Sequence, residues 1–251
     1  MVKIILDNRE IEAEEGTTVL EAARRLGIPI PTLCDHPAIE PYGACRLCMV
    51  EIGSGERSRL ATACTYPVRE GLRVTTDSAR VLKARAFIIE LLLSRCPDSV
   101  ELQAIARGLG VVKSRFPSAD ESRKCILCGL CVRVCGELIG AAAIGFIHRG
   151  TRRVVETPFR SMSDACIGCG ACAFVCPTGA VALEDREKKR ALETWHTELE
   201  RARCAECGEH FATVEALDRV KKALKLPADL LALCGRCRRK KTGRELIPAR
   251  E

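Results

Sequence analysis

The sequence has few aromatic residues and no long apolar run. Its 251 residues include only six Phe, two Tyr and one Trp, so aromatic packing is too sparse to organise the interior by itself. The strongest apolar stretch, residues 87–93, is interrupted by Glu90 and is far shorter than the roughly 18 residues of a membrane-spanning helix. We therefore expect a chain that does not insert into a membrane.

Signals for export and for nucleotide binding are also missing. The N-terminus, Met1 to Asp7, has no basic segment followed by a long apolar run, so we expect a reducing, cytoplasmic location. Neither GxGxxG nor GxxxxGKS or GxxxxGKT occurs, which argues against NAD or ATP binding by those loops. The formal net charge of +7 is concentrated in residues 236–251, which hold seven Lys/Arg and two Glu. A short basic tail without interleaved aromatics disfavours nucleic-acid binding.

Cysteine, by contrast, is abundant, with 17 residues. Spacing sorts sixteen of them into four groups of four and leaves Cys96 alone. The groups are Cys34/Cys45/Cys48/Cys64, Cys125/Cys128/Cys131/Cys135, Cys166/Cys169/Cys172/Cys176 and Cys204/Cys207/Cys234/Cys237. Two-residue gaps let thiolates converge on one metal centre and suit disulfide geometry poorly. The sequence therefore predicts four metal sites.

The second and third groups have the spacing of paired [4Fe–4S] sites. The third group reads CxxCxxCxxxCP from Cys166 to Pro177, and the second repeats it with Gly136 in place of the proline. In this motif three thiolates hold one cube and the fourth holds the neighbouring cube. One cube is then expected on Cys125, Cys128, Cys131 and Cys176, and the other on Cys166, Cys169, Cys172 and Cys135. Two zinc knuckles are a poorer interpretation, because zinc sites rarely contain a third cysteine after another two-residue gap and a fourth after a three-residue gap.

The first group lies in a segment that begins like a β-grasp ferredoxin domain. Its gaps of ten, two and fifteen residues resemble a [2Fe–2S] arrangement with a lengthened first gap. Alternating apolar residues predict strands at 2–6 and 11–13. The pattern Thr18-x-x-Glu21 is a capping box that predicts a helix ending at Gly27. Further strands are expected at 49–52 and 72–75, so the group Cys34, Cys45, Cys48 and Cys64 is predicted to hold a [2Fe–2S] cluster.

Three segments carry a resemblance to a known family. They are GTTVLEAA at 16–23, PIPTLC at 29–34 and GACRLCMVE at 43–51. They resemble the N-terminal cluster region of the 75-kDa-type subunit of complex I, the diaphorase small subunit of NAD-linked hydrogenases and the front end of many [FeFe] hydrogenases. The paired [4Fe–4S] motifs follow in the same order, and the resemblance spans about residues 1–185.

Two departures from that family are visible. A His–Cys cluster motif is expected before the paired motifs, but this chain keeps only Cys96 of its four ligands, with Ser99 and Ile105 at two thiolate positions. That cluster should be missing, and Cys96 is expected to be a buried thiol. After Cys176 there are 75 residues, which we expect to be too few for a hydrogenase or molybdopterin catalytic domain.

The last group consists of two CxxC pairs 26 residues apart. Such pairs favour a zinc-ribbon-like or treble-clef site, with another Fe–S cluster as the alternative. Apolar residues at helical spacing predict a helix over 213–224, and Pro227 is expected to start a short helix to 233. With four thiolates available, His210 is interpreted as a surface residue.

The expected fold class is α+β with five parts. These are a β-grasp [2Fe–2S] domain (1–77), a helical connector with the degenerate His–Cys site (78–112), a two-cube ferredoxin domain that opens with a polar linker at 113–124 (113–183), a charged linker helix (184–203) and a zinc module with a basic tail (204–251). The linker helix is expected to carry Leu192, Trp195 and Leu199, and Trp195 is expected to be a packing anchor.

These features predict a non-catalytic electron-transfer subunit of a cytoplasmic oxidoreductase complex. By the resemblance, its partners would be a flavin- and NAD(P)-binding subunit and a hydrogenase, formate dehydrogenase or similar catalytic subunit. A free-standing polyferredoxin shuttle is an alternative of the same class. An Fe–S and zinc protein that regulates through nucleic-acid binding, using the basic residues beside Cys237, is an alternative of another class.

Overall fold

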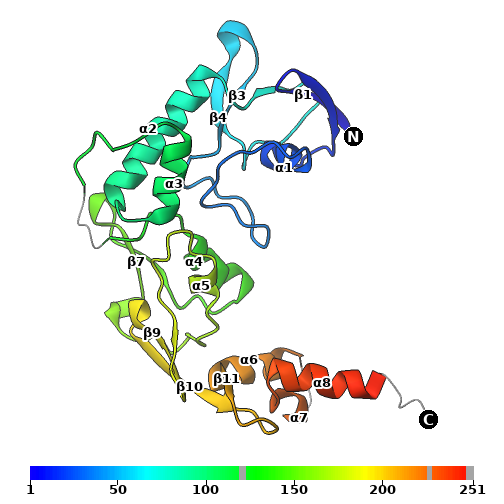
Figure 1. Cartoon of the computed structure of the whole chain (residues 1–251), viewed down its shortest axis with the longest axis vertical. Coiled ribbons are helices and arrows are strands. Elements are labelled where there is room, and N and C mark those ends of the chain that lie inside the picture. The colour runs from blue at the N-terminus through cyan, green and yellow to red at the C-terminus, as the bar shows by residue number, and fades with distance from the viewer. Residues whose placement is uncertain (119–122, 225–227, 247–251) are drawn as a thin grey trace. The chain divides into compact units, whose positions relative to one another are not determined.

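The computed structural model describes residues 1–118, 123–224 and 228–246. The chain divides into two compact units (Figure 1). The first unit contains Met1–Leu130 and Val175–Ala180, and the second contains Cys131–Phe174 and Val181–Glu251. The segment 113–183, expected to be one ferredoxin domain, is therefore shared between the two units. Within the described part of 113–124, the predicted linker has no helix or strand.

A five-stranded mixed sheet forms the core of the first unit. Its order is β2-β1-β5-β3-β4, and the strands are β1 (Val2–Leu6), β2 (Arg9–Ala13), β3 (Met49–Ile52), β4 (Arg59–Thr62) and β5 (Arg73–Thr75). The hairpin between β1 and β2 turns at Asp7 and Asn8, both with positive φ, which Asn and Asp tolerate better than other side chains. The predicted strands are confirmed, whereas β4 was not predicted.

Helix α1 (Val19–Arg25) begins at the predicted capping box. The Thr18 side chain accepts from the Glu21 backbone N–H, and the Glu21 carboxylate accepts from the Thr18 N–H. The helix buries Val19 and Leu20 against the sheet residues Ile4 and Val50. This continuous apolar core holds the loops on either side of β3 in place.

Two antiparallel helices form the connector, as expected from the sequence. They are α2 (Ala79–Arg95) and α3 (Val100–Gly108), each capped by a serine side chain, Ser78 and Ser99. Helix α2 packs on β3 through Arg85, whose Nε and Nη2 donate to the Met49 carbonyl at 3.0 and 2.7 Å. A guanidinium is thereby buried beside the loop that carries Cys48.

The second unit contains short elements around the cysteine motifs. Helix α4 (Leu130–Arg133) crosses from the first unit and continues as a π-helical turn, η2 (Val134–Leu138). A hairpin of β6 (Gly145–Ile147) and β7 (Val154–Glu156) precedes α5 (Ala171–Phe174). Further single turns are η3 (Gly150–Arg152) and η4 (Pro158–Arg160), while η1 (Gly55–Arg57) belongs to the first unit. This hairpin was not predicted.

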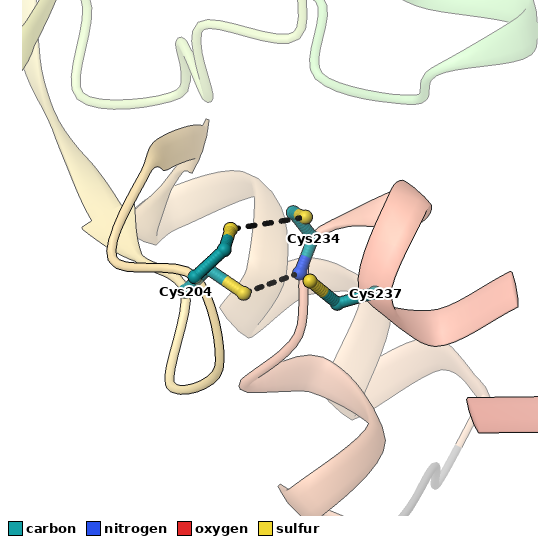
Figure 2. Close-up of side chains that lie close together, drawn as sticks. Cys204, Cys234 and Cys237 are labelled. Atoms are coloured by element: carbon teal, nitrogen blue, oxygen red, sulfur yellow. Dashed lines mark hydrogen bonds between the residues drawn. The ribbon is translucent and has the colours of Figure 1, made fainter. Parts of the chain in front are cut away.

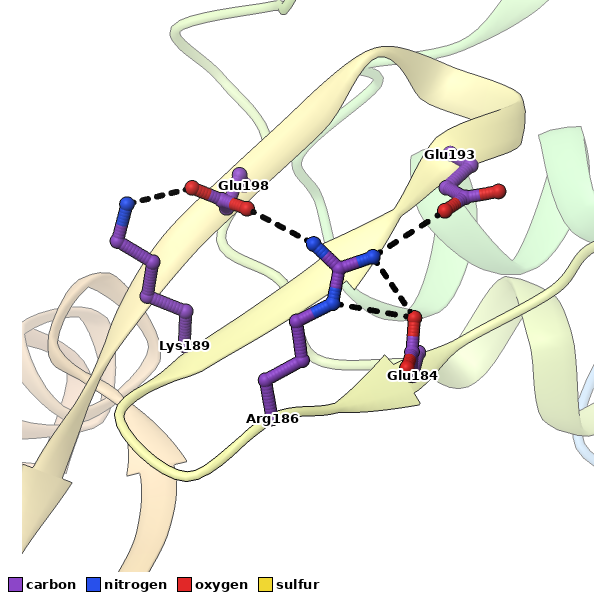
Figure 3. A network of polar contacts seen from close by, with 5 residues as sticks. All are labelled: Glu184, Arg186, Lys189, Glu193 and Glu198. Atoms are coloured by element: carbon purple, nitrogen blue, oxygen red, sulfur yellow. Dashed lines mark hydrogen bonds and ion pairs between the residues drawn. The ribbon is translucent and has the colours of Figure 1, made fainter.

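The expected linker helix over 184–203 is wrong. This segment forms the strands β8 (Glu184–Asp185), β9 (Lys189–Leu192) and β10 (Thr197–Arg203), with the turn η5 (Glu193–Trp195) between the last two. Leu192, Trp195 and Leu199 have helix-compatible spacing, but Thr197 to Glu200 alternate buried and exposed, which is a strand pattern. The charges pair with one another on this sheet: Arg186, in the turn after β8, contacts Glu184, Glu193 and Glu198 (Figure 3).

Strand β11 (His210–Thr213) completes this sheet, whose order is β11-β10-β9-β8. It is followed by α6 (Val214–Leu224), α7 (Ala228–Leu231) and α8 (Gly235–Leu246). The helix predicted over 213–224 is confirmed, while the predicted start of a helix at Pro227 lies outside the described residues. No helix in the described part of the chain is both long and apolar enough to cross a membrane.

Candidate metal centres

The four cysteines expected to hold a [2Fe–2S] cluster lie in two loops of the first unit. Cys34, Cys45 and Cys48 lie between α1 and β3, and Cys64 follows β4; all four side chains are buried. A hydrogen bond between Cys34 and Cys45 raises the pKa of Cys34 and lowers that of Cys45 to about 7. A second bond, with Cys64, lowers the pKa of Cys48 to about 7. The structure thus brings these four thiols together, two of them poised to ionise.

The loop backbone also points N–H groups at this site. The Cys45 N–H donates to the Cys34 sulfur at 3.3 Å. Arg46, between Cys45 and Cys48, has φ +60, which is uncommon for a residue with a side chain. The backbone of the next residue, Leu47, hydrogen-bonds to Cys45 and helps to lower its pKa. Anionic sulfur is stabilised by such donors, so the loop is shaped for thiolates.

Arg85 adds a buried positive charge beside this site, which sequence reasoning missed. Only 4% of this residue is exposed, and burial lowers the pKa of its guanidinium while the neighbouring Cys48 raises it. The charges of Asp7 and Asp77 also raise this pKa. A buried cation is costly unless negative groups compensate it, and thiolates at the cysteine loop would add to the compensation from these two carboxylates.

Three of the residues expected to hold the first cube lie in the first unit. They are Cys125, Cys128 and Cys176, whereas Cys131 is the first residue of the second unit. The Leu127 N–H donates to the Cys125 sulfur at 3.4 Å, and the Ala180 N–H donates to the Cys176 sulfur at 3.2 Å. The Thr178 hydroxyl donates to the Lys124 carbonyl at 2.6 Å, which fastens the two segments together. Burial raises the pKa of Cys128 to about 12, and the charges of Cys125 and Cys176 add to the shift.

Cys96 is fully buried at the C-terminal end of α2. Burial raises its pKa to about 11, with a further contribution from the charge of Cys125. The buried location agrees with the thiol expected from the sequence.

The residues expected to hold the second cube line one small cavity within the second unit. Cys135, Cys166, Cys169 and Cys172 all contribute to its wall. The Ala143 N–H donates to the Cys135 sulfur at 3.4 Å, and burial raises the pKa of Cys172 to about 11. Cys169 is exposed. This cavity therefore contains one cysteine from the earlier motif and three from the later one.

The sheet β8-β9-β10-β11 supports this cavity from outside the cysteine motif. Arg190 donates to the Gly168 carbonyl at 2.9 Å, and the Thr213 hydroxyl donates to the Ile167 carbonyl. A Cβ on Gly168 would lie 2.8 Å from the Thr213 methyl carbon, so only glycine fits. The indole of Trp195, a packing anchor as expected, also donates Nε1–H to the Cys172 sulfur at 3.4 Å. The sequence analysis missed these contacts because it predicted a helix where the structure has strands.

Helix α6 contacts the segment that follows Cys135. Arg219 donates from Nη2 to the carbonyls of Ile139 and Gly140, at 3.0 and 2.8 Å. These two carbonyls end the turn that begins around Cys135. Since α6 lies between Cys207 and Cys234, the C-terminal cysteine group is linked to the Cys135 segment through one helix.

The chemistry of these sites fits iron–sulfur clusters. Backbone N–H groups donate to the sulfurs of Cys34, Cys125, Cys135 and Cys176. Thiolates that ligate a cluster carry negative charge and are stabilised by such donors, which also help to set the reduction potential. A chain that used these cysteines as uncharged packing residues would not need amides directed at the sulfurs.

The last four cysteines form a compact group. Their ligand atoms all lie within 4.8 Å of one another, with Cys204, Cys234 and Cys237 facing one another (Figure 2). The first pair lies in the turn between β10 and β11, and the second lies at the start of α8. Hydrogen bonds from the backbones of Cys207 and Cys234 lower the pKa of Cys204 to about 6. The group can hold one metal ion, and His210 in β11 is not among its ligands.

Two family models match the chain. Residues 1–79 match a 2Fe-2S iron-sulfur cluster binding domain, and residues 165–213 match a 4Fe-4S dicluster domain. The first range contains Cys34, Cys45, Cys48 and Cys64, and the second contains the motif from Cys166 to Cys176. Both kinds of iron–sulfur domain are therefore present.

Curated relatives contain similar sequences within longer proteins. The chain is 37% identical over 204 residues to the alpha subunit of the NADPH-Fe(3+) oxidoreductase of Geobacter sulfurreducens, covering 72% of this chain and 24% of the relative. It is 34% identical to a subunit of an NADH-quinone oxidoreductase of Rhizobium meliloti, covering 83% and 27%. It is also 34% identical to the HndD subunit of the NADP-reducing hydrogenase of Solidesulfovibrio fructosivorans, covering 72% and 36%. The chain thus spans about a quarter to a third of their lengths.

A solved structure shows the same relationship in three dimensions. A chain of the NAD+-reducing [NiFe]-hydrogenase in the H2-reduced state is 31% identical, with a TM-score of 0.56, covering 62% of this chain and 74% of that one. These matches agree with the resemblance inferred from the cysteine segments. The chain belongs to the family of iron–sulfur electron-transfer subunits whose members occur in NADH-quinone oxidoreductases, also called complex I, and in NAD(P)-linked hydrogenases.

Proposed function

We propose that this chain carries single electrons through one [2Fe–2S] and two [4Fe–4S] clusters within a larger oxidoreductase complex. The supporting observation is that the four cysteines of the [2Fe–2S] group lie in the same compact unit as Cys125, Cys128 and Cys176 of the first-cube group. Clusters exchange one electron without making bonds. Neighbouring clusters in one protein body therefore suit a path for electrons.

The proposed ligand sets follow the crossing of the paired motifs. The first cube uses Cys125, Cys128, Cys131 and Cys176, and the second uses Cys166, Cys169, Cys172 and Cys135. Two observations support this assignment. Cys135 shares a cavity with the later motif, and Cys176 is assigned to the same compact unit as Cys125 and Cys128.

The protein around these sites excludes water to different degrees. The cysteines of the [2Fe–2S] group are buried, whereas Cys169 of the second-cube group is exposed. Electron transfer to a partner needs a cluster close to the protein surface. We therefore propose that the side of the second unit that displays Cys169 exchanges electrons with a partner subunit.

For the C-terminal cysteines we propose one zinc ion with a structural role. A CxxC turn between two strands and a second CxxC at a helix start are typical of zinc sites. The helix start also places backbone N–H groups and the positive end of the helix dipole near thiolates. Anaerobically prepared protein should contain about ten irons and one zinc per chain. About fourteen irons without zinc would instead show a further Fe–S cluster.

The proposed partners are a flavin- and NAD(P)-binding subunit and a catalytic subunit such as a hydrogenase or formate dehydrogenase, in the cytoplasm. The relatives named above are NAD(P)-linked oxidoreductase and hydrogenase subunits, which supports the first partner most directly. A nucleic-acid role is less well supported, because basic residues of α8 contact the protein itself. Arg236 pairs with Glu209, Lys241 pairs with Asp229, and Arg238 donates to the Leu233 carbonyl.

The decisive experiment is reduction of the anaerobically purified chain followed by electron paramagnetic resonance. We expect dithionite to produce the signals of one [2Fe–2S] and two [4Fe–4S] clusters, and the chain alone to oxidise none of NADH, hydrogen or formate. Turnover should appear after native partner subunits are added. Turnover by the chain alone, or iron content far below ten with no cluster signals, would overturn the proposal.

A further inference from the structure

The indole of Trp195 contacts the second-cube site directly. Its Nε1–H donates to the Cys172 sulfur at 3.4 Å, and only 3% of the residue is exposed. Trp195 also lines the cavity that contains Cys135, Cys166, Cys169 and Cys172. The donor comes from η5, outside the motif that carries the cysteines. It is therefore an addition to the motif's own backbone amides.

The structure fixes the position of this indole. The Thr197 hydroxyl donates to the Trp195 carbonyl at 2.8 Å, and His196 adopts φ +51 to close the turn. Leu192 and Thr197 are paired across β9 and β10. Arg190, on β9, ties the same hairpin to the Gly168 carbonyl. The indole is thus held by both its own turn and the loop it faces.

A donor in this position acts on reduction. When a cluster accepts one electron, its negative charge rises by one, and the ligand sulfurs share that charge. A hydrogen bond to a thiolate sulfur stabilises the more negative state, so it raises the reduction potential. The effect is stronger where solvent is excluded and the local dielectric is low, and the Trp195 indole is itself buried.

We propose that Trp195 is a redox-tuning residue that raises the reduction potential of the second cube. This inference rests on the proposed function, since it requires a cluster on Cys135, Cys166, Cys169 and Cys172. The hairpin of β9 and β10 then has a role in electron flow. The hydrogen bond from Trp195 makes the second cube accept an electron more readily than the backbone amides of the cysteine motif would by themselves. Trp195 acts through the Cys172 sulfur and does not bind iron.

The test replaces Trp195 with Phe in the full-length holoprotein. Trp195→Phe keeps an aromatic ring and removes the N–H. The control is Leu192→Val, because Leu192 lines the same cavity and its shortening disturbs packing without removing a donor. The midpoint potential of each cluster is measured by electron paramagnetic resonance during reduction with dithionite and mediators.

In Trp195→Phe we expect the equilibrium constant for reducing the second cube to fall about three- to tenfold, as for loss of one hydrogen bond. At 59 mV per tenfold for one electron, this is a shift of about 30 to 60 mV to more negative potential. The other two clusters and the iron content should not change, and Leu192→Val should leave all potentials in place. No shift in Trp195→Phe, or an equal shift in Leu192→Val, would overturn the inference.

A second measurement uses the wild-type protein, so it does not require that any variant folds. The chain has a single tryptophan, so protein labelled with ¹⁵N at the indole reports on Trp195 alone. Electron–nuclear double resonance of the reduced wild-type second cube should show coupling to that nitrogen. A resolved second-cube signal without such coupling contradicts the inference. Wild-type protein that contains no second cube contradicts the proposed function instead, so the two failures are distinguishable.

Discussion

The two units support their cysteines in different ways. In the first unit the [2Fe–2S] loops extend from a sheet and helix whose side chains form a continuous apolar core, including Ile4, Leu20 and Val50. In the second unit the cysteines line a cavity whose wall combines a few buried apolar side chains, among them Leu192 and Trp195, with hydrogen bonds to backbone carbonyls, such as the one from Arg190 to Gly168. A large apolar core persists without metal, whereas a few apolar side chains and separate hydrogen bonds stabilise mainly loops that are already ordered. We therefore expect the second unit to depend more on its metals.

The two units also differ in how far their cysteines are exposed to solvent. The cysteines of the [2Fe–2S] group are buried, and the residue that supplies charge to them, Arg85, is buried too. In the second unit Cys169 is exposed, and the loop beside it is supported by Arg190 of β9 and Thr213 of β11. A buried site suits electron storage or relay, and an exposed site suits exchange with a partner.

The largest expected effect comes from substituting Cys176, which is proposed to ligate the cube of the other cysteine motif. Cys176→Ser should disturb the cube on Cys125, Cys128 and Cys131, removing about four irons, because Cys176 belongs to the same unit as Cys125 and Cys128. Iron analysis and electron paramagnetic resonance of the reduced variant measure this loss. The mirror variant, Cys135→Ser, should disturb the other cube. Loss confined to the cube of Cys166 and Cys169 in Cys176→Ser would contradict the assignment.

The next effect tests whether the second unit depends on its C-terminal metal. Cys234→Ser should lose the proposed zinc and loosen α6 and β11, whose Arg219 and Thr213 hold both parts of the second-cube cavity. The second cube should then be lost faster in the presence of a chelator, while the [2Fe–2S] signal persists. Metal analysis and time-resolved spectra follow the losses. A second cube as durable as in the wild type would show that the two sites are independent.

A smaller effect is expected in the first unit from Arg85. Arg85→Met removes the positive charge beside Cys48 and the two hydrogen bonds to Met49, so the [2Fe–2S] potential should become more negative. The unpaired carbonyl should also lower the free energy of unfolding by about 1 to 3 kcal/mol. Arg85→Lys, which keeps the charge, is the matched control and should shift the potential less. Equal potentials in Arg85→Met and wild type would refute an electrostatic role.

The smallest effect is expected at Cys96. Because this thiol is fully buried at the end of α2, Cys96→Ser should keep about ten irons and all three cluster signals. A modest loss of stability is expected from burying a hydroxyl in place of a thiol. Loss of four irons in the variant, or about fourteen irons with zinc still bound in the wild type, would show that Cys96 ligates a cluster.

Local sequence patterns predicted much of the first unit. The capping box at Thr18 and the alternation in 2–6 act within a few residues, so they can be recognised without tertiary information. Strand β4 was missed because its four residues, Arg59–Thr62, carry little alternation. Short strands of this kind are defined by their partners, here β3.

The segment 184–203 shows where local patterns are ambiguous. Leu192, Trp195 and Leu199 are spaced as on one helix face, but the same residues also fit strands joined by a tight turn. Pairing of β9 with β10 and of β10 with β11 selects the strands. Since hydrogen bonding between strands is non-local, the sequence alone favoured the wrong periodicity.

The sequence by itself determined that this protein contains 2Fe-2S and 4Fe-4S domains. Cysteine spacing is a local property, and the gaps within each motif leave few ligand geometries that a chain can satisfy. The tertiary structure alone decided which other side chains act on those thiols. Arg85 reaches Met49 from 36 residues away, and Trp195 reaches Cys172 from 23 residues away. Such contacts depend on how helices and hairpins pack, for which no local spacing rule exists.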